Sequence, residues 1–248
     1  MKVSIITVSY NAEKTIADTV NSVLSQTYNN IEYIIIDGAS KDKTLDILDG
    51  FKSESFHLIS EPDNGLYDAM NKGITKATGD IVGILNADDV FADTSVVEEV
   101  VKEFIKTGAD CLYSDLKYVK EDLKTTVRNW VSGDYVKGAF TKGWMPPHPT
   151  FYVKRECYDK FGSFNLKFKT SADYELMLRF LHREEIPVAY LPKTTILMRV
   201  GGQSNASIKN RINANKEDRL AWKENGLKAG SLTFIRKPLS KLKQFVKK

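Results

Sequence analysis

The chain has 248 residues, 42% of them hydrophobic, which is enough for one large domain with a buried core, and no apolar run approaches the about 18–20 residues that cross a bilayer. Its two cysteines lie far apart and outside any Cys/His cluster, so neither a disulfide framework nor a zinc site is indicated. The net charge is +4, but residues 223–248 alone carry +7, from eight basic residues and one acid. A basic tail on a slightly acidic body favours an anionic surface over nucleic acid as the binding partner.

Strands and helices alternate through the first half of the chain. Short β-branched or apolar runs predict strands at residues 3–8, 31–36, 57–60 and 81–85. Apolar residues at helical spacing, with capping and stop residues, predict helices at residues 13–25, 66–77 and 94–107, and a further one that carries Leu45, Leu48 and Phe51. This order predicts an α/β fold with a doubly wound, mostly parallel sheet.

The alternation becomes irregular beyond about residue 110. Short strands are predicted at residues 111–114, 124–128, 150–153 and 195–200, and a helix at 172–181, with a Gly- and Pro-rich stretch at 143–149 between them. We therefore expect one domain at residues 1–205 in two halves, 1–110 and 111–205, the second with a small antiparallel part. A helical, basic extension at 206–248 follows.

Polar residues follow each of the first four predicted strands. They occupy residues 9–11, 37–38, 61–64 and 86–89. Ligands of a parallel sheet bind at the carboxyl ends of its strands, so these side chains are predicted to share one binding edge. Loops also collect Asp and Asn for turn formation, which is the alternative reading of each segment taken alone.

The turn Asn86-Ala87-Asp88-Asp89 offers oxygen ligands to Mg²⁺ or Mn²⁺. Such an ion takes one or two carboxylates and completes its shell with water and substrate phosphates, whose charge it offsets. Neither a G-x-G-x-x-G nor a P-loop motif is present, so a backbone cradle for phosphates is not indicated. The alternative is an acidic turn that only caps the next helix.

Asp173 lies in the first turn of the helix predicted at 172–181. A carboxylate at this position can point away from the core and accept a proton as a general base. It can equally be an acid that only stabilises the N-terminus of the helix. Glu175 is the nearest alternative for the base.

Residues 3–11, 34–42 and 61–73, together with the turn at 86–89, resemble in order the motifs of family 2 glycosyltransferases of GT-A fold. The resemblance covers about residues 1–205 and is strongest to bacterial members that build surface polysaccharides such as colanic acid, capsule or O-antigen. It implies that residues 1–110 bind a nucleotide-sugar donor and that residues 111–205 form the acceptor side.

The same resemblance implies a role for individual residues on the donor side. Thr7, Ser9 and Tyr10 would line the nucleoside pocket, and Asp37 would hydrogen-bond the base, with uracil preferred. The residues facing the ribose or diphosphate would be Asp68, Asn71 and Lys72. The segment Asn86-Ala87-Asp88 resembles the family's DxD motif, with Asp88 as ligand of Mn²⁺ or Mg²⁺ and Asn86 in place of the first acid, so the site carries one negative charge fewer.

Asp173 matches the catalytic acid of the family's Glu-Asp motif, with Ala172 in place of the glutamate. The family resemblance implies an inverting transfer in one displacement with no protein nucleophile. The Q-x-x-R-W motif of processive synthases is absent, which favours the addition of a single sugar. Two alternatives remain: a non-catalytic nucleotide-sugar-binding subunit of a synthase complex, and a nucleotidyltransferase on a related fold.

His148, Asp89 and Glu175 are the acceptor-side candidates, although His148 also suits a loop histidine held by prolines. Residues 201–205 suit a lid over the donor or a tight turn. A helix from Pro238 onward would combine apolar residues with lysines as an interfacial anchor does, and a frayed terminus is the alternative. We expect a cytoplasmic chain, with a glycan or lipid-linked acceptor and the basic tail as a candidate contact with the inner face of the cytoplasmic membrane.

Overall fold

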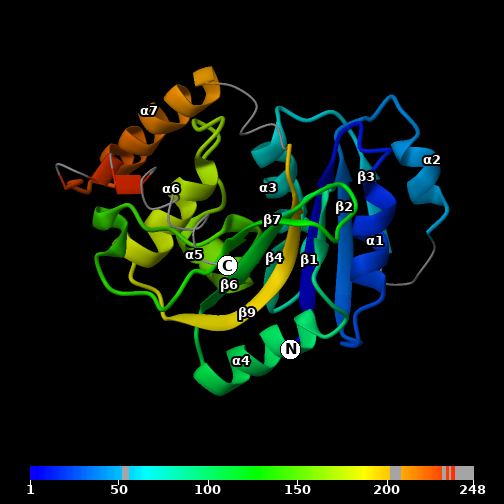
Figure 1. The fold of residues 1–248 in the computed structure, drawn as a ribbon, viewed down its shortest axis with the longest axis horizontal. Coiled ribbons are helices and arrows are strands. Elements are labelled where there is room, and N and C mark those ends of the chain that lie inside the picture. The colour runs from blue at the N-terminus through cyan, green and yellow to red at the C-terminus, as the bar shows by residue number, and fades with distance from the viewer. Residues whose placement is uncertain (52–55, 202–207, 231–232, 235, 238–248) are drawn as a thin grey trace.

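The computed structural model describes residues 1–51, 56–201, 208–230, 233–234 and 236–237. Within these residues one curled sheet has the strand order β3-β2-β1-β4-β8-β6-β9-β5, with β7 paired to β6, and helices cover its faces (Figure 1). The predicted α/β class with a mostly parallel sheet is confirmed. The calls on residues 202–205 and on a helix from Pro238 lie outside the described residues.

The first four strands are mutually parallel, as predicted. They are β1 (Val3–Ser9), β2 (Ile31–Asp37), β3 (Phe56–Ser60) and β4 (Ile81–Ile84). The helices of this half are α1 (Ile16–Leu24), α2 (Thr44–Asp49), α3 (Leu66–Lys76) and α4 (Val96–Thr107). Side chains alternate along β1, so Val3 and Ile5 pack with α1 and α4, whereas Ile6 and Val8 pack with α3 on the other face.

The second half continues the same sheet. Its strands are β5 (Asp89–Phe91), β6 (Cys111–Val119), β7 (Thr126–Trp130), β8 (Tyr152–Lys154) and β9 (Val188–Arg199). β8 runs antiparallel to both β4 and β6, β7 runs antiparallel to β6 and β5 to β9, whereas β9 is parallel to β6. The antiparallel part is therefore present, and β9 is longer than the strand predicted at 195–200 because residues 188–191 also pair with β6.

The helices of the second half lie at the far end of the sheet (Figure 1). They are the short η1 (Ala139–Lys142) and η2 (His148–Thr150), then α5 (Arg155–Phe161), α6 (Ala172–Leu178), the π-turn η3 (Arg179–Arg183) and α7 (Ile208–Glu224). α6 begins where the sequence predicts but changes into η3 before residue 181. α7 packs along α6. Among the described helices, none combines the length and apolar content required to cross a bilayer.

Candidate active site

The polar residues that follow β1 and β2 lie side by side because these strands are parallel neighbours. The side-chain oxygen of Asn11 accepts a hydrogen bond from the backbone N–H of Lys41 at 2.9 Å. The backbone N–H of Asn11 donates to the Ser40 hydroxyl at 2.8 Å. β4 pairs with β1 on the other side, so the turn at 86–89 follows at the same edge. This edge is called the rim below.

Asp37, predicted to bind the base, is fully buried at the end of β2. Its carboxylate accepts hydrogen bonds from the hydroxyls of Ser9, Ser40 and Ser60 and from the amide of Ser40. A carboxylate has about four acceptor positions, and all are engaged within the chain. Asp37 therefore ties together three segments of the rim, and a contact with a base would require one serine to give up its bond.

The three predicted nucleoside-pocket residues differ in exposure. Thr7 has no exposed surface, and its hydroxyl is 3.0 Å from the phenol oxygen of Tyr33, so it lies beneath the rim rather than on it. Ser9 is nearly buried and donates to Asp37. Tyr10 is 58% exposed and offers an aromatic face to a ligand. Of the three, only Tyr10 presents a large free surface.

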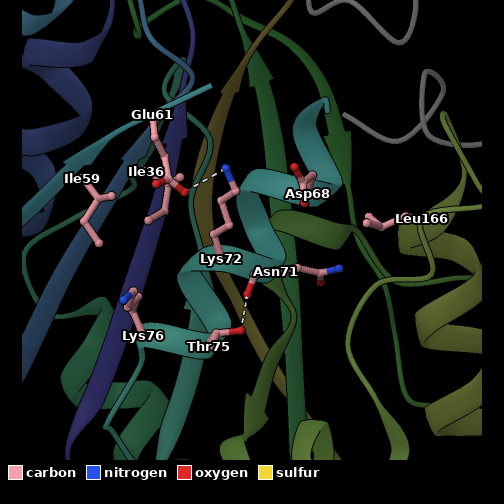
Figure 2. A pocket seen from close by; sticks show the side chains of 9 residues that line it. All are labelled: Ile36, Ile59, Glu61, Asp68, Asn71, Lys72, Thr75, Lys76 and Leu166. Carbon is pink, nitrogen blue, oxygen red and sulfur yellow. Dashed lines mark hydrogen bonds and ion pairs between the residues drawn. The ribbon is translucent and has the colours of Figure 1, made fainter. Parts of the chain in front are cut away.

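A hollow of about 500 Å³ lies beside α3, and Asp68, Asn71 and Lys72 are among its walls (Figure 2). Its volume is within the range of small-molecule sites. Lys72 is already engaged there, because its ammonium is 2.9 Å from the carboxylate of Glu61 and donates to the carbonyl of Pro62 at 2.7 Å. The hollow thus holds all three residues predicted to face the ribose or diphosphate.

Asn71 and Asp68 also have partners within the chain. The Asn71 side chain donates to the carbonyl of Phe164 at 2.8 Å and accepts from its amide at 2.9 Å. Asp68 accepts from the amide of Asn64 at 2.9 Å. Asn71 therefore anchors the loop around Phe164 to α3, a function that the sequence did not indicate.

The turn Asn86–Asp89 divides its acids between the surface and the interior. Asp89 is fully buried, and burial, with the neighbouring charge of Asp88 in addition, raises its pKa well above the usual value. The Asn86 amide donates to Asp89 at 3.0 Å. Asp88 is partly exposed, and burial raises its pKa although the charge of Arg199 opposes this. Asp89 was predicted on the acceptor side, and this is wrong because its side chain has no exposed surface.

The fit of this turn to a divalent cation can be judged from its donor atoms. Asp88 supplies a partly exposed carboxylate, and the side-chain oxygen of Asn86 is buried with no hydrogen-bond partner in the described part of the chain. No cluster of three His, Cys, Asp or Glu side chains suited to a metal occurs among the described residues. One carboxylate and one amide fit an ion that takes its other ligands from water and phosphates.

Arg199, at the end of β9, is a site residue that the sequence analysis missed. Its guanidinium donates to the carbonyl of Asp88 at 2.8 Å and also bonds the carboxylate of Asp18 from α1. The side chain is nearly buried. It therefore fixes the turn that carries Asp88, and its position at the carboxyl end of a predicted strand was the available signal.

Asp173 lies in the first turn of α6, as predicted, and is partly exposed. It accepts a hydrogen bond from the phenol of Tyr67 on α3 at 3.1 Å. Burial, with the charge of Asp173 in addition, raises the pKa of Tyr67 well above its usual value, so Tyr67 stays a donor. Phe164 stacks on Tyr67 and meets the ring of His148 edge-on. These four residues are called the Asp173 cluster below.

The Asp173 cluster and the Asp88 turn lie at the same end of the sheet. Because β8 runs antiparallel to β4, the residues that precede β8 lie toward the carboxyl end of β4, where the turn begins. These residues form η2, which contains His148 and contacts β4. The topology thus brings both predicted carboxylates, Asp88 and Asp173, to one rim.

Glu175 is neither a base nor an acceptor contact, which corrects the prediction. It is buried, pairs with Arg179 at 3.0 Å through both oxygens and accepts from the Asn225 amide. The helical spacing of two residues from Asp173 turns Glu175 to the opposite side of α6, into the core.

Residues 4–168 match the family described as Glycosyl transferase family 2. A relative from Mycobacterium tuberculosis (strain CDC 1551 / Oshkosh), the uncharacterized glycosyltransferase MT1564, is 34% identical over 187 residues, which is 71% of this chain and 68% of that protein. The family match ends before Asp173 and α7.

Two solved structures share the fold. S. aureus TarS 1–349 in complex with UDP-GlcNAc superposes with a TM-score of 0.70 at 17% identity, covering 91% of this chain and 65% of that one. The mannosyltransferase PcManGT from Pyrobaculum calidifontis, in complex with GDP-Man and Mn²⁺, gives 0.66 at 18% identity and covers 99% and 69%.

The partly buried His148 ring, whose Nε2 atom is itself buried, predicts how acid affects stability. Its Nε2 has no partner among the described residues, and burial lowers its pKa although the charge of Asp173 opposes this. As the pH falls below the ordinary histidine value, the unfolded chain takes up this proton before the folded chain does, so stability is lost. Urea unfolding should therefore show a smaller loss between about pH 7.5 and about pH 5.5 for His148→Gln than for the wild type. An equal loss of stability in His148→Gln and in the wild type would contradict this prediction. His57→Gln, at an exposed histidine, is the control and should lose as much stability as the wild type.

Proposed function

The chain belongs to glycosyl transferase family 2, and we propose that it moves a single sugar from a nucleotide-diphosphate sugar to a hydroxyl group of an acceptor, with inversion at the anomeric carbon. The observation that carries the proposal is the placement of Asp88 and Asp173 at one rim, because one serves the donor phosphates and the other the acceptor. That it is a glycosyltransferase follows from the family itself.

The acceptor side of the reaction is assigned to Asp173. Its carboxylate accepts the proton of the acceptor hydroxyl while that oxygen forms its bond to the anomeric carbon. The bond from the anomeric carbon to the phosphate oxygen breaks in the same displacement, and its electron pair leaves with the nucleoside diphosphate. Tyr67 donates to Asp173 and keeps the carboxylate in place. No covalent sugar–protein intermediate is required.

The donor side is assigned to the rim around Asp88. A divalent cation, Mn²⁺ or Mg²⁺, would be held by Asp88, with Asn86 beside it, and would offset the charge of the diphosphate as it leaves. The exposed ring of Tyr10 suits a nucleoside base, and a uridine diphosphate donor is proposed. Support comes from TarS and PcManGT, solved with UDP-GlcNAc and with GDP-Man and Mn²⁺ respectively.

Replacement of the proposed base should separate chemistry from binding. Asp173→Asn preserves the shape of the side chain but cannot take up the proton, so the rate of sugar transfer should fall by about 10²- to 10⁴-fold while UDP affinity stays unchanged. Release of UDP from candidate UDP-sugars with an acceptor mixture measures the rate, and calorimetry measures binding.

Asp159→Asn, at an exposed acid on α5, is the matched control and should keep full activity. If Asp173→Asn keeps the wild-type rate, Asp173 is not the base. If the wild-type chain binds UDP but transfers no sugar to any acceptor, the non-catalytic alternative is supported instead.

The cation assignment can be tested without turnover. UDP with Mn²⁺ should raise the melting temperature of the wild type more than UDP alone. The Asp88→Asn substitution removes the negative charge of the side chain that would bind the cation. The UDP affinity in the presence of Mn²⁺ should therefore fall about tenfold or more, which corresponds to about 1.4 kcal/mol of binding free energy. Asp93→Asn, at an exposed acid further along the chain, should leave the effect of Mn²⁺ unchanged. An Asp88→Asn variant that responds to Mn²⁺ like the wild type would refute the assignment.

A glycan or lipid-linked acceptor is also proposed, and with it contact of the basic tail with an anionic membrane. Support comes from the net charge of +7 over residues 223–248. Each basic residue near such a surface contributes about 1 kcal/mol of binding free energy. Replacing four tail lysines by Gln should therefore lower the affinity for phosphatidylserine vesicles, measured by co-sedimentation, more than tenfold. These lysines are Lys241, Lys243, Lys247 and Lys248. The control replaces the exposed lysines Lys102, Lys106, Lys120 and Lys124. Equal binding of both variants would argue against the tail contact.

A further inference from the structure

The N-terminus of α6 lacks a cap from its own segment. Its N-cap residue, Ser171, makes no capping hydrogen bond with its side chain. The first amide groups of a helix have no partner within the helix and need one from elsewhere. Because Asp173 is the second residue of α6, a group that binds the backbone leading into the helix also helps to fix the proposed base.

Glu217 of α7 binds the backbone at this N-cap residue and just before it. One carboxylate oxygen accepts from the amides of Thr170 and Ser171 at 2.8 and 2.9 Å and from the Thr170 hydroxyl at 2.9 Å. The other accepts from the amide of Lys169 at 3.1 Å. Three consecutive residues leading into α6 are thus bound by a single carboxylate, and bonds to an ionised acceptor are about twice as strong as neutral ones.

Further contacts hold the turn of α6 that contains Asp173 against α7. The indole of Trp222 donates to the phenol of Tyr174 at 2.8 Å, and the amide of Asn225 donates to Glu175 at 3.0 Å. Trp222, Asn225 and Tyr174 are all buried. The two residues that follow Asp173 are therefore fixed from α7 and from Asn225, the residue after it, whereas the Asp173 side chain itself remains partly exposed.

Glu217 also lies within electrostatic reach of the Asp173 cluster. Burial is the largest cause of the raised pKa of Tyr67 and the charge of Asp173 is the next, but the charge of Glu217 contributes as well. Tyr67 is the residue that donates to Asp173. The carboxylate that binds the backbone before α6 therefore also acts on the residue that donates to the proposed base.

We propose that Glu217 is a positioning residue for Asp173, so that α7, which lies beyond the segment matched to the family, completes the active site. This inference rests on the proposed function. Loss of Glu217 frees three amides and allows the start of α6 to move, and a displacement of about 1 Å at a reacting group can lower a rate about 100-fold. Donor binding depends on the opposite side of the rim and should not change.

The test compares Glu217→Ala, Glu217→Gln and the wild type as full-length chains. We expect kcat to fall about 10- to 100-fold in Glu217→Ala, and less in Glu217→Gln because an amide oxygen can still accept from Thr170 and Ser171. The UDP dissociation constant should stay within about twofold of the wild type. Glu224→Ala is the matched control, since it removes a different carboxylate from the same helix. The partner of the Glu224 carboxylate is the exposed Lys167. It should keep the wild-type kcat.

A double-mutant cycle separates positioning from general support. In an Asp173→Asn chain the residual rate should be unaffected by Glu217→Gln, because the residue acts only through Asp173. The inference is overturned if Glu217→Gln and Glu217→Ala both keep the wild-type kcat, or if Glu217→Gln lowers the rate equally with and without Asp173. If Asp173→Asn alone leaves the rate unchanged, it is the proposed function that fails. Melting temperatures identify a variant that does not fold, and Glu217→Gln is the variant retained in that case.

Discussion

The antiparallel pairing of β4 with β8 is the constraint on which the site depends. Ile81 pairs with Lys154 and Val82 with Val153, and the strands approach so closely that a Cβ at Gly83 would come within 2.5 Å of the Tyr152 ring. β4 leads into the turn with Asp88, and β8 begins after the segment with His148. A single strand pair therefore joins the Asp88 turn to the segment that carries His148 of the Asp173 cluster, although the two are far apart in sequence.

Three of the acids near the site have structural roles and do not face a ligand. Asp37 holds three serines, Asp89 is buried beneath its neighbour, and Glu175 is neutralised by Arg179. A buried carboxylate persists only when hydrogen bonds or a cation satisfy it, or when it takes up a proton. Asp88 and Asp173 differ from these three in retaining part of their surface, which the roles proposed for them require.

Local patterns were sufficient for the regular part of the fold. The apolar spacing of α1, α3 and α4 and the β-branched runs of β1 and β2 predicted elements whose ends differ from the structure by a few residues. α5 was missed because seven residues with two buried apolar side chains carry little periodicity. The first part of β9 was missed as well, because Pro192 interrupts the apolar pattern although residues on both sides pair with β6.

By itself, the sequence determined the alternation of strands and helices in the first half of the chain, the polar ends of the parallel strands and the presence of Asp173 in the first turn of a helix. These features follow from short-range periodicity and turn chemistry. Only the tertiary structure decided which of the polar residues face outward, that Arg199 secures the Asp88 turn and that Glu217 binds the backbone leading into α6. The burial of a side chain and its hydrogen-bond partners depend on segments distant in the chain. The residues next to it in the sequence therefore do not predict them.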